Sequence, residues 1–157
     1  MDLIYQKAGI ADLDILTDLR AEVLRAANGL PSSTDMSEVK RQTRCYYQRA
    51  LLDDTHAAYL VWDGGRVVGA GGVSFFQVMP TYHNPSGTNA YIMNMYTRPE
   101  YRRRGIARKT LDLLVQEARD RGVAAISLEA TAMGRPLYEA YGFIPMEHEM
   151  ELPERRG

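Results

Sequence analysis

Six cationic side chains stand among the twelve residues from Arg98 to Lys109, and they surround one glycine, Gly105. In chain order this region is an apolar, strand-like segment, a break at Pro99, an arginine-rich turn and the start of a helix. The first turn of a helix leaves backbone N–H groups unpaired, and the helix dipole adds positive potential there. Because a glycine also lets the backbone approach a ligand closely, the region predicts an anion site that suits a diphosphate.

The alternative for this region is a solvated cationic loop, which its charge alone would favour. The order of strand, break, glycine and helix favours the diphosphate site instead. A nucleic-acid binder using the same arginines is a further alternative. The whole chain has 19 Lys and Arg against 20 Asp and Glu, a net charge of −1, and shows no second basic segment. This balance argues against a general nucleic-acid or membrane-surface binder.

Two segments of the chain resemble motifs of the GNAT N-acetyltransferase superfamily. The run Arg102-Arg103-Arg104-Gly105-Ile106-Ala107 fits the R/Q-x-x-G-x-G/A signature of that family, and residues 137–143, LYEAYGF, resemble its second conserved segment. The two motifs occur in the family's order and at its spacing. Thr131 and Gly134 depart from the pattern, since many members have Asn and Ala there and use them near the pantetheine arm.

The resemblance implies acetyl-coenzyme A as the acyl donor and a primary amine, on a small molecule or a peptide, as the acceptor. It also implies that no metal takes part. By the family pattern, backbone groups of Met95, Tyr96 and Thr97 bind the pantetheine. The pyrophosphate is then expected to lie against a second set of residues, namely Arg102, Arg103, Arg104, Gly105, Ile106, Ala107 and Arg108.

Amide formation by direct attack needs a base, an N–H donor for the oxyanion and an acid for the leaving thiolate. Tyr138 stands at the family position of the acid, and a phenol with a pKa near ~10 stays protonated at neutral pH. The alternative for Tyr138 is an aromatic residue of the core. The Met95 N–H is the expected oxyanion donor by family position. Glu129 is the candidate base, because burial at the end of a strand would raise its pKa; a structural hydrogen bond, or a water chain acting as base, are the alternatives.

These residues need a scaffold, and the hydrophobic periodicity predicts one. The expected class is α/β (α+β), with a GNAT-like mixed, mostly antiparallel central sheet flanked by helices. The predicted order is β-α-α-β-β-β-α-β-α-β, with room for one more strand, in a single domain over residues 1–157. The expected strands are 3–7, 58–62, 66–73 with an extension to 79, 88–97, 123–128 and 143–152. The expected helices are 12–28, 35–51, 105–121 and 136–141.

The run Gly69-Ala70-Gly71-Gly72 has some likeness to a dinucleotide-binding loop. It follows a predicted hairpin and leads into a strand rather than a helix, so close packing beneath a neighbouring element explains it better. A single cysteine, Cys45, excludes a disulfide framework and a multi-cysteine zinc site. The three histidines, His56, His83 and His148, lack the spacing of metal ligands.

No stretch approaches the ~18 apolar residues of a membrane span, and the start of the chain lacks the features of a signal peptide, so a cytoplasmic protein is expected. The sequence leaves a homodimer open. It also leaves open a catalytically silent acyl-CoA sensor as the alternative to the enzyme. Glu147, Glu149 and Glu151 alternate with His148, Met150 and Leu152 in the last predicted strand. They predict either a row that attracts cationic amines or an ordinary solvated face.

Overall fold

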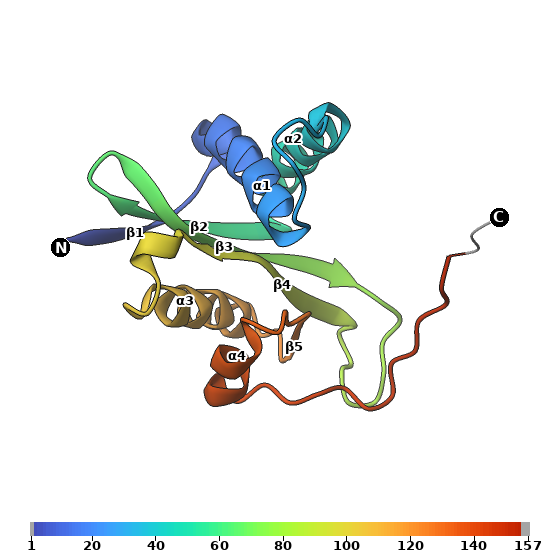
Figure 1. Ribbon diagram of the computed structural model, residues 1–157. Coiled ribbons are helices and arrows are strands. Elements are labelled where there is room, and N and C mark those ends of the chain that lie inside the picture. The colour runs from blue at the N-terminus through green and yellow to red at the C-terminus, as the bar shows by residue number, and fades with distance from the viewer. Residues whose placement is uncertain (1, 155–157) are drawn as a thin grey trace.

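In the computed structural model, which describes residues 2–154, one five-stranded sheet lies between two layers of helices (Figure 1). Helices α1 and α2 cover one face of the sheet, and α3 and α4 lie on the other face (Figure 1). The strands are β1 (Leu3–Lys7), β2 (His56–Asp63), β3 (Arg66–Gln77), β4 (Thr88–Thr97) and β5 (Ala125–Leu128). The α-helices are α1 (Leu13–Ala27), α2 (Ser37–Leu52), α3 (Ile106–Asp120) and α4 (Arg135–Tyr141).

The strands follow one another in chain order across the sheet, from β1 to β5. The first three pairs are antiparallel, and β4 and β5 are parallel. The mixed, mostly antiparallel sheet and the element order up to α4 confirm the prediction. The expected last strand over residues 143–152 is wrong for the single chain, because these residues follow α4 as irregular backbone, with a bend at residues 147–148, and have no neighbouring strand.

Helix α3 forms because its apolar residues recur on one face, which becomes fully buried. Leu111, Leu114 and Ala118 have no exposed surface and pack in one core cluster with Val73 and Ile92 of the sheet. The close packing predicted for the glycine run is confirmed by this contact. A Cβ atom on Gly69 would lie 3.0 Å from Ile106 Cγ2 at the start of α3. The glycines of β3 therefore bring the beginning of α3 close to the sheet.

The other face of the sheet has a separate core. Leu16 and Leu19 of α1 and Tyr47 of α2 pack there against Leu60 and Ala70 of the sheet. Because β2 and β3 bury both faces, they carry apolar residues almost without interruption. The sheet thus holds α1 and α2 in a fixed position relative to α3.

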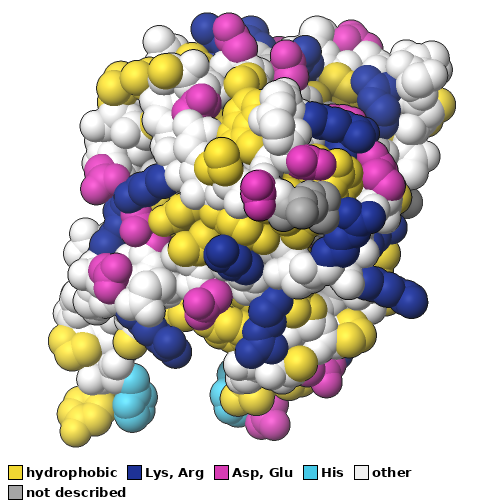
Figure 2. Space-filling model, turned by 90° about the vertical axis from the view of Figure 1, so that its left-hand side faces the viewer, with side chains coloured by type: hydrophobic (Ala, Val, Ile, Leu, Met, Phe, Trp, Pro, Cys, Tyr) yellow, Lys and Arg dark blue, Asp and Glu magenta, His cyan; other side chains and the backbone are white. Residues whose placement is uncertain are grey.

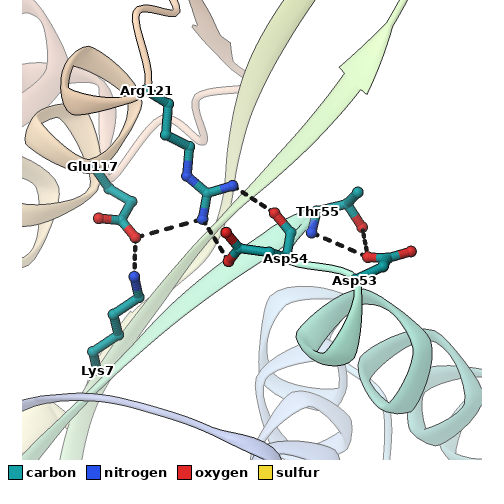
Figure 3. A network of polar contacts seen from close by, with 6 residues as sticks. All are labelled: Lys7, Asp53, Asp54, Thr55, Glu117 and Arg121. Carbon is teal, nitrogen blue, oxygen red and sulfur yellow. Dashed lines mark hydrogen bonds and ion pairs between the residues drawn. The ribbon is translucent and has the colours of Figure 1, made fainter.

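A network of charged groups joins the C-terminal end of α3 to β1 and to the loop before β2 (Figure 3). Glu117 forms ion pairs with Lys7 and with Arg121, and Arg121 Nη2 lies 3.5 Å from Glu117 Oε1. Arg121 also reaches Asp54, with its Nη2 atom 3.0 Å from the carboxylate, and its guanidinium lies 4.0 Å from the centre of the Phe75 ring. The network fixes the far end of α3, whereas the glycine contacts fix its beginning.

Candidate functional site

The outer edge of β4 is paired over only part of its length. Residues Asn89–Ile92 pair in parallel with β5, and β5 ends at Leu128. Within the described residues, the segment from Met93 to Thr97 has no strand beside it on that edge. The backbone groups of Met95, Tyr96 and Thr97 thus lie where an extended ligand could bind like an added strand.

A bulge in β4 gives this edge its shape. The pairing of β3 with β4 changes register between Ala70 and Gly72, and Asn94 has a φ of 60°, in the left-handed region. Arg20 of α1 donates a hydrogen bond to Asn94 Oδ1 at 3.2 Å and so supports this conformation. A bulge leaves a backbone group unpaired and re-aims the chain, which places the expected oxyanion donor, Met95, directly after the irregular residue.

Thr97 provides an independent sign of a ligand at this edge. Its Oγ1 atom is buried and has no hydrogen-bond partner among the described residues. A buried hydroxyl without a partner is costly, and a bound polar ligand would supply the missing bond. The pantetheine arm, with its two amides, fits that requirement.

The N-terminus of α3 has the backbone geometry expected of an anion site. Gly105 is the N-cap residue with a φ of 80°, and Arg103, two residues earlier, has a φ of 64°. A Cβ atom on Gly105 would meet no atom within 4 Å, so the space beside this residue is open. Ile106 is buried and anchors the first turn, which leaves the unpaired N–H groups of that turn facing this space.

The cations of this region fall into three groups by the contacts that they make. Arg98 donates to the Val67 carbonyl at 2.7 Å and pairs with Glu22, so it serves the scaffold. Arg104, Arg108 and Lys109 lie over aromatic rings, at 4.3–5.1 Å from the ring centres. Arg102 and Arg103 are exposed and form no ion pair with other described residues. Arg102 and Arg103 are therefore the side chains best placed to add to the backbone N–H groups at the expected diphosphate site.

Tyr138 of α4 lies on the same side of the sheet as α3. It is 9% exposed, and burial raises the pKa of its phenol above the usual value. Its ring packs edge-on against Phe143, and a Cβ atom on Gly134 would lie 3.0 Å from it. Thr131 Oγ1 accepts a hydrogen bond from the Gly134 N–H. The two residues that depart from the family pattern thus make room for Tyr138 and support the turn before it.

Glu129 is not buried, contrary to the prediction. It follows β5 directly, but it is exposed, so the burial expected to make it a base is absent. Its carboxylate lies close enough to help raise the pKa of Tyr91, after the larger effect of burial. Glu129 as the base therefore remains a prediction, without the physical reason first given for it.

On the α1 and α2 side, a cavity of about 220 Å³ opens beside the bulge. Its walls include Arg20, Tyr46, His56, Ser74, Met93 and Asn94. Tyr46 Oη lies 2.8 Å from His56 Nδ1 and 2.6 Å from Ser74 Oγ. Sequence reasoning missed this cavity, because its residues come from five elements and share no local spacing.

His56 is the most perturbed group of this cavity. It is 4% exposed, and its Nε2 atom has no partner among the described residues. Burial, with smaller contributions from Arg121 and Arg20, lowers the pKa of His56 to about 4. The imidazole is therefore neutral at neutral pH, and Arg20 is the charged group on the cavity wall. No acidic side chain lines this cavity in the described part of the chain.

The comparisons with known proteins agree with this geometry. The family model described as "Acetyltransferase (GNAT) family" matches residues 21–143. This chain belongs to the GNAT acetyltransferase family. A predicted acetyltransferase with acetyl-CoA from Clostridium acetobutylicum is 31% identical to this GNAT protein, with a TM-score of 0.88 over 97% of this chain and 96% of that one. A GCN5-related N-acetyltransferase from Ralstonia eutropha JMP134 is 26% identical, with a TM-score of 0.83 over 98% and 99% of the two chains.

A curated relative is the uncharacterized N-acetyltransferase YsnE of Bacillus subtilis (strain 168), with 31% identity over 87 residues. This match covers 52% of each protein, so the GNAT chain spans about half the length of that curated relative. Residues 2–154 contain no helix long and apolar enough to cross a membrane. They also contain no group of three or more His, Cys, Asp or Glu residues that could hold a metal ion.

The surface in Figure 2 bears on the nucleic-acid alternative. Lys and Arg side chains on this face are interspersed with Asp and Glu rather than gathered into one basic area (Figure 2). Binding to a nucleic acid backbone requires a continuous basic surface. This face therefore gives no support to that alternative.

Proposed function

We propose that this protein transfers an acetyl group from acetyl-CoA to a primary amine, by direct attack within a ternary complex. The observation that carries the proposal is the unpaired edge of β4 from Met93 to Thr97, which runs toward the open N-terminus of α3. An extended pantetheine arm fits the β4 edge, and the diphosphate at its end fits the N-terminus of α3. The acetyl-CoA in the structure of the Clostridium protein supports the same donor.

The donor binds through backbone groups in this proposal. Met95, Tyr96 and Thr97 hold the pantetheine, and the Thr97 hydroxyl gains its missing partner. The residues from Arg102 to Arg108 hold the pyrophosphate through the first N–H groups of α3 and the exposed side chains of Arg102 and Arg103. No metal is required for these contacts.

In the reaction, the amine nitrogen forms a bond to the thioester carbon, and the Met95 N–H stabilises the oxyanion. The C–S bond then breaks, and Tyr138 gives its phenolic proton to the leaving thiolate. As the amide forms, the nitrogen loses its second proton, which returns Tyr138 to its phenol form. The raised pKa keeps that proton on Tyr138 at neutral pH. Water in the site takes the first proton that the ammonium must lose, and Glu129, which directly follows β5, is the proposed final acceptor of that proton.

The acceptor enters, in this proposal, through the cavity on the α1 and α2 side, which opens at Met93 and Asn94 next to Met95. Its positive charge, Arg20, favours an amine that also carries an acidic group over an amine with further cationic groups. The glutamate row expected to attract cationic amines is not formed in the single chain, because residues 143–152 make no strand. We therefore do not retain a preference for polycationic acceptors.

The test is thiol release from acetyl-CoA in the presence of a panel of amines that carry acidic, neutral or cationic groups. Release with at least one amine, and the acetylated product by mass spectrometry, is expected. Binding of acetyl-CoA without release for every amine would favour the silent acyl-CoA sensor. If acetyl-CoA does not bind, both the acetyltransferase and the acyl-CoA sensor are ruled out.

A further inference from the structure

The cavity beside the bulge carries a positive charge that no described acidic residue balances. Arg20 of α1 is half-buried on its wall and donates a hydrogen bond to Asn94 Oδ1 at 3.2 Å, and it forms no ion pair with another described residue. The three acidic residues of α1 are each paired with a different cation, as Asp14–Arg44, Asp18–Lys40 and Glu22–Arg98. A guanidinium has five N–H donors, so Arg20 keeps several of them for a ligand with a negative charge.

His56 determines what else the cavity offers, because one of its two ring nitrogens is blocked. A Cβ atom on Gly72 would lie 2.8 Å from His56 Nε2 and 3.0 Å from His56 Cε1, so this side of the ring lies against the glycine of the neighbouring strand. His56 is buried, and its Nε2 atom has no partner among the described residues. Buried N–H groups without a partner are rare, so a neutral imidazole in this position carries its proton on Nδ1.

A proton on Nδ1 leaves one hydroxyl hydrogen of the cluster for a ligand. His56 Nδ1, Tyr46 Oη and Ser74 Oγ lie 2.6–3.1 Å from one another. The Nδ1–H donates to one hydroxyl oxygen, and one hydroxyl donates to the other. The second hydroxyl hydrogen has no acceptor in this triangle, because an Nδ1 atom that carries a proton cannot accept one. Met93 Sδ, at 3.7 Å from Ser74 Oγ, is only a weak acceptor.

The opposite tautomer would reverse the chemistry of the wall. With the proton on Nε2, Nδ1 accepts one hydroxyl hydrogen, and the second hydroxyl hydrogen closes the contact between Tyr46 and Ser74. Both donors would then be used within the triangle, and only lone pairs would be left for a ligand. The contact of His56 with Gly72 therefore makes this wall a hydrogen-bond donor.

A guanidinium and a hydroxyl donor suit one particular anion. Burial lowers the pKa of His56 to about 4 and raises the pKa of Tyr46, so neither group adds a charge at neutral pH. One positive charge with N–H and O–H donors complements one carboxylate, whose two oxygens accept two bonds from an arginine. A phosphate monoester, with a charge of about −1.5 to −2, would leave a net negative charge in the cavity.

The size and place of the cavity restrict the molecule that carries this carboxylate. A volume of about 220 Å³ is the share of about seven liquid water molecules at ~30 Å³ each, so the molecule is small. Arg20 is bonded to Asn94, the residue before the proposed oxyanion donor Met95. The carboxylate and the reacting amine are therefore only a few bonds apart.

We propose that the acceptor is a small amino acid, and that Arg20 and the remaining hydroxyl donor of the Tyr46–Ser74 pair bind its carboxylate. This inference rests on the proposed acetyltransferase activity and narrows its acceptor. His56 and Gly72 are positioning residues, because they act through Tyr46 and Ser74 by fixing the direction of the hydroxyl hydrogens.

Thiol release from acetyl-CoA with matched acceptors tests the substrate class. The panel pairs small amino acids from glycine to leucine, and β-alanine, with their own carboxamides, and it includes diamines of similar length. We expect kcat/KM to be at least about tenfold higher for an acid than for its carboxamide, as one lost charge-assisted bond predicts. Equal or faster release with carboxamides or diamines would overturn the carboxylate site but not the acetyltransferase. Release with none of these amines would overturn the proposed function as well.

Arg20→Gln tests the residue that binds the carboxylate. It should lower the ratio of kcat/KM between acid and carboxamide by at least about tenfold, mainly through a higher KM for the acid. The matched control is Arg25→Gln, which removes the same charge from α1 outside the cavity, where Arg25 Nη1 donates to the Pro31 carbonyl at 2.7 Å. An unchanged ratio in Arg20→Gln, or an equal fall in both variants, would overturn the proposal.

Nitrogen NMR of the wild type, labelled at its histidines, tests the donor wall without a substitution in the protein studied. The spectrum of His56→Gln serves only to assign the His56 signals. At neutral pH we expect His56 to carry its proton on Nδ1 and to have a bare Nε2. A proton on Nε2 would leave the wall without a hydroxyl donor and would overturn the proposal.

Discussion

Gly71 of β3 lies directly against Met95 of β4: a Cβ atom at position 71 would be 2.8 Å from Met95 Sδ. The same Cβ atom would meet Thr110 Cγ2 at 2.8 Å and Leu114 Cδ1 at 2.9 Å, both on α3. Gly71 also lies where the pairing of β3 and β4 changes register. The missing side chain therefore sets how closely α3 approaches the edge proposed to hold the acetyl group.

Replacing Gly71 tests this packing. Gly71→Val should lower the free energy of unfolding by about 1–3 kcal/mol, because Met95 and α3 must both move. It should also weaken acetyl-CoA binding. Denaturant unfolding and calorimetry measure the two effects. Gly65→Val, in the β2–β3 turn where a Cβ atom meets nothing within 4 Å, should keep wild-type affinity. Equal loss of affinity in both variants would contradict a specific role for Gly71.

Gly105→Glu tests the anion site. The new carboxylate would stand at the N-terminus of α3 at a residue with positive φ, and acetyl-CoA affinity should fall by more than about tenfold. The control is Gly122→Glu after the end of α3, where φ is +74° and the space is likewise open. It carries the same backbone strain and charge. Calorimetry showing unchanged affinity in folded Gly105→Glu would remove the pyrophosphate assignment.

Tyr138→Phe tests the acid. It should lower kcat by roughly ten- to a thousand-fold with acetyl-CoA affinity nearly kept, because only the hydroxyl is removed. Since burial raises the pKa of Tyr138, the wild type should not lose activity through this group below a pH of about 10. Tyr141→Phe on the same helix, which loses a hydrogen bond to Asp112, is the control. Wild-type turnover in Tyr138→Phe would show that the thiolate needs another proton donor.

His56 predicts how stability depends on pH. Its pKa is about 4 in the folded chain and about 6.5 when unfolded, so the unfolded chain binds the extra proton between these values. The free energy of unfolding should be highest above pH 6.5 and fall by about 3 kcal/mol as the pH drops toward 4. His56→Gln should flatten this slope, whereas His83→Gln, in an exposed loop, should not. Equal slopes in wild type and His56→Gln would contradict a buried neutral imidazole.

The backbone geometry of the expected donor site could be predicted because its residues are contiguous. The strand Thr88–Thr97, the break at Pro99, the glycine and the helix follow one another within about twenty residues, so local sequence patterns are sufficient. The packing role of the β3 glycines could be predicted for the same reason. The left-handed backbone conformation of Asn94 could not be predicted, because it depends on the register of β3 against β4 and on the hydrogen bond from Arg20.

The cavity proposed for the acceptor, and whether residues 143–152 form a strand, depend on contacts between residues distant in sequence. Arg20, Tyr46 and Ser74 meet only after α1, α2 and β3 pack together, and no spacing in the chain indicates that meeting. Alternation over residues 143–152 predicts a strand, but a strand also needs a neighbour, which periodicity cannot supply. The cytoplasmic location and the role of Glu129 remain predictions.

The central claim is that acetyl-CoA binds along β4 and ends at the N-terminus of α3. Backbone amide NMR during titration with acetyl-CoA tests it most directly. We expect the largest shift changes at Met95, Tyr96 and Thr97 and at Gly105, Ile106 and Ala107, with small changes on β1 and β2. Saturable binding that leaves these six amides unchanged, or no binding at all, would contradict the account.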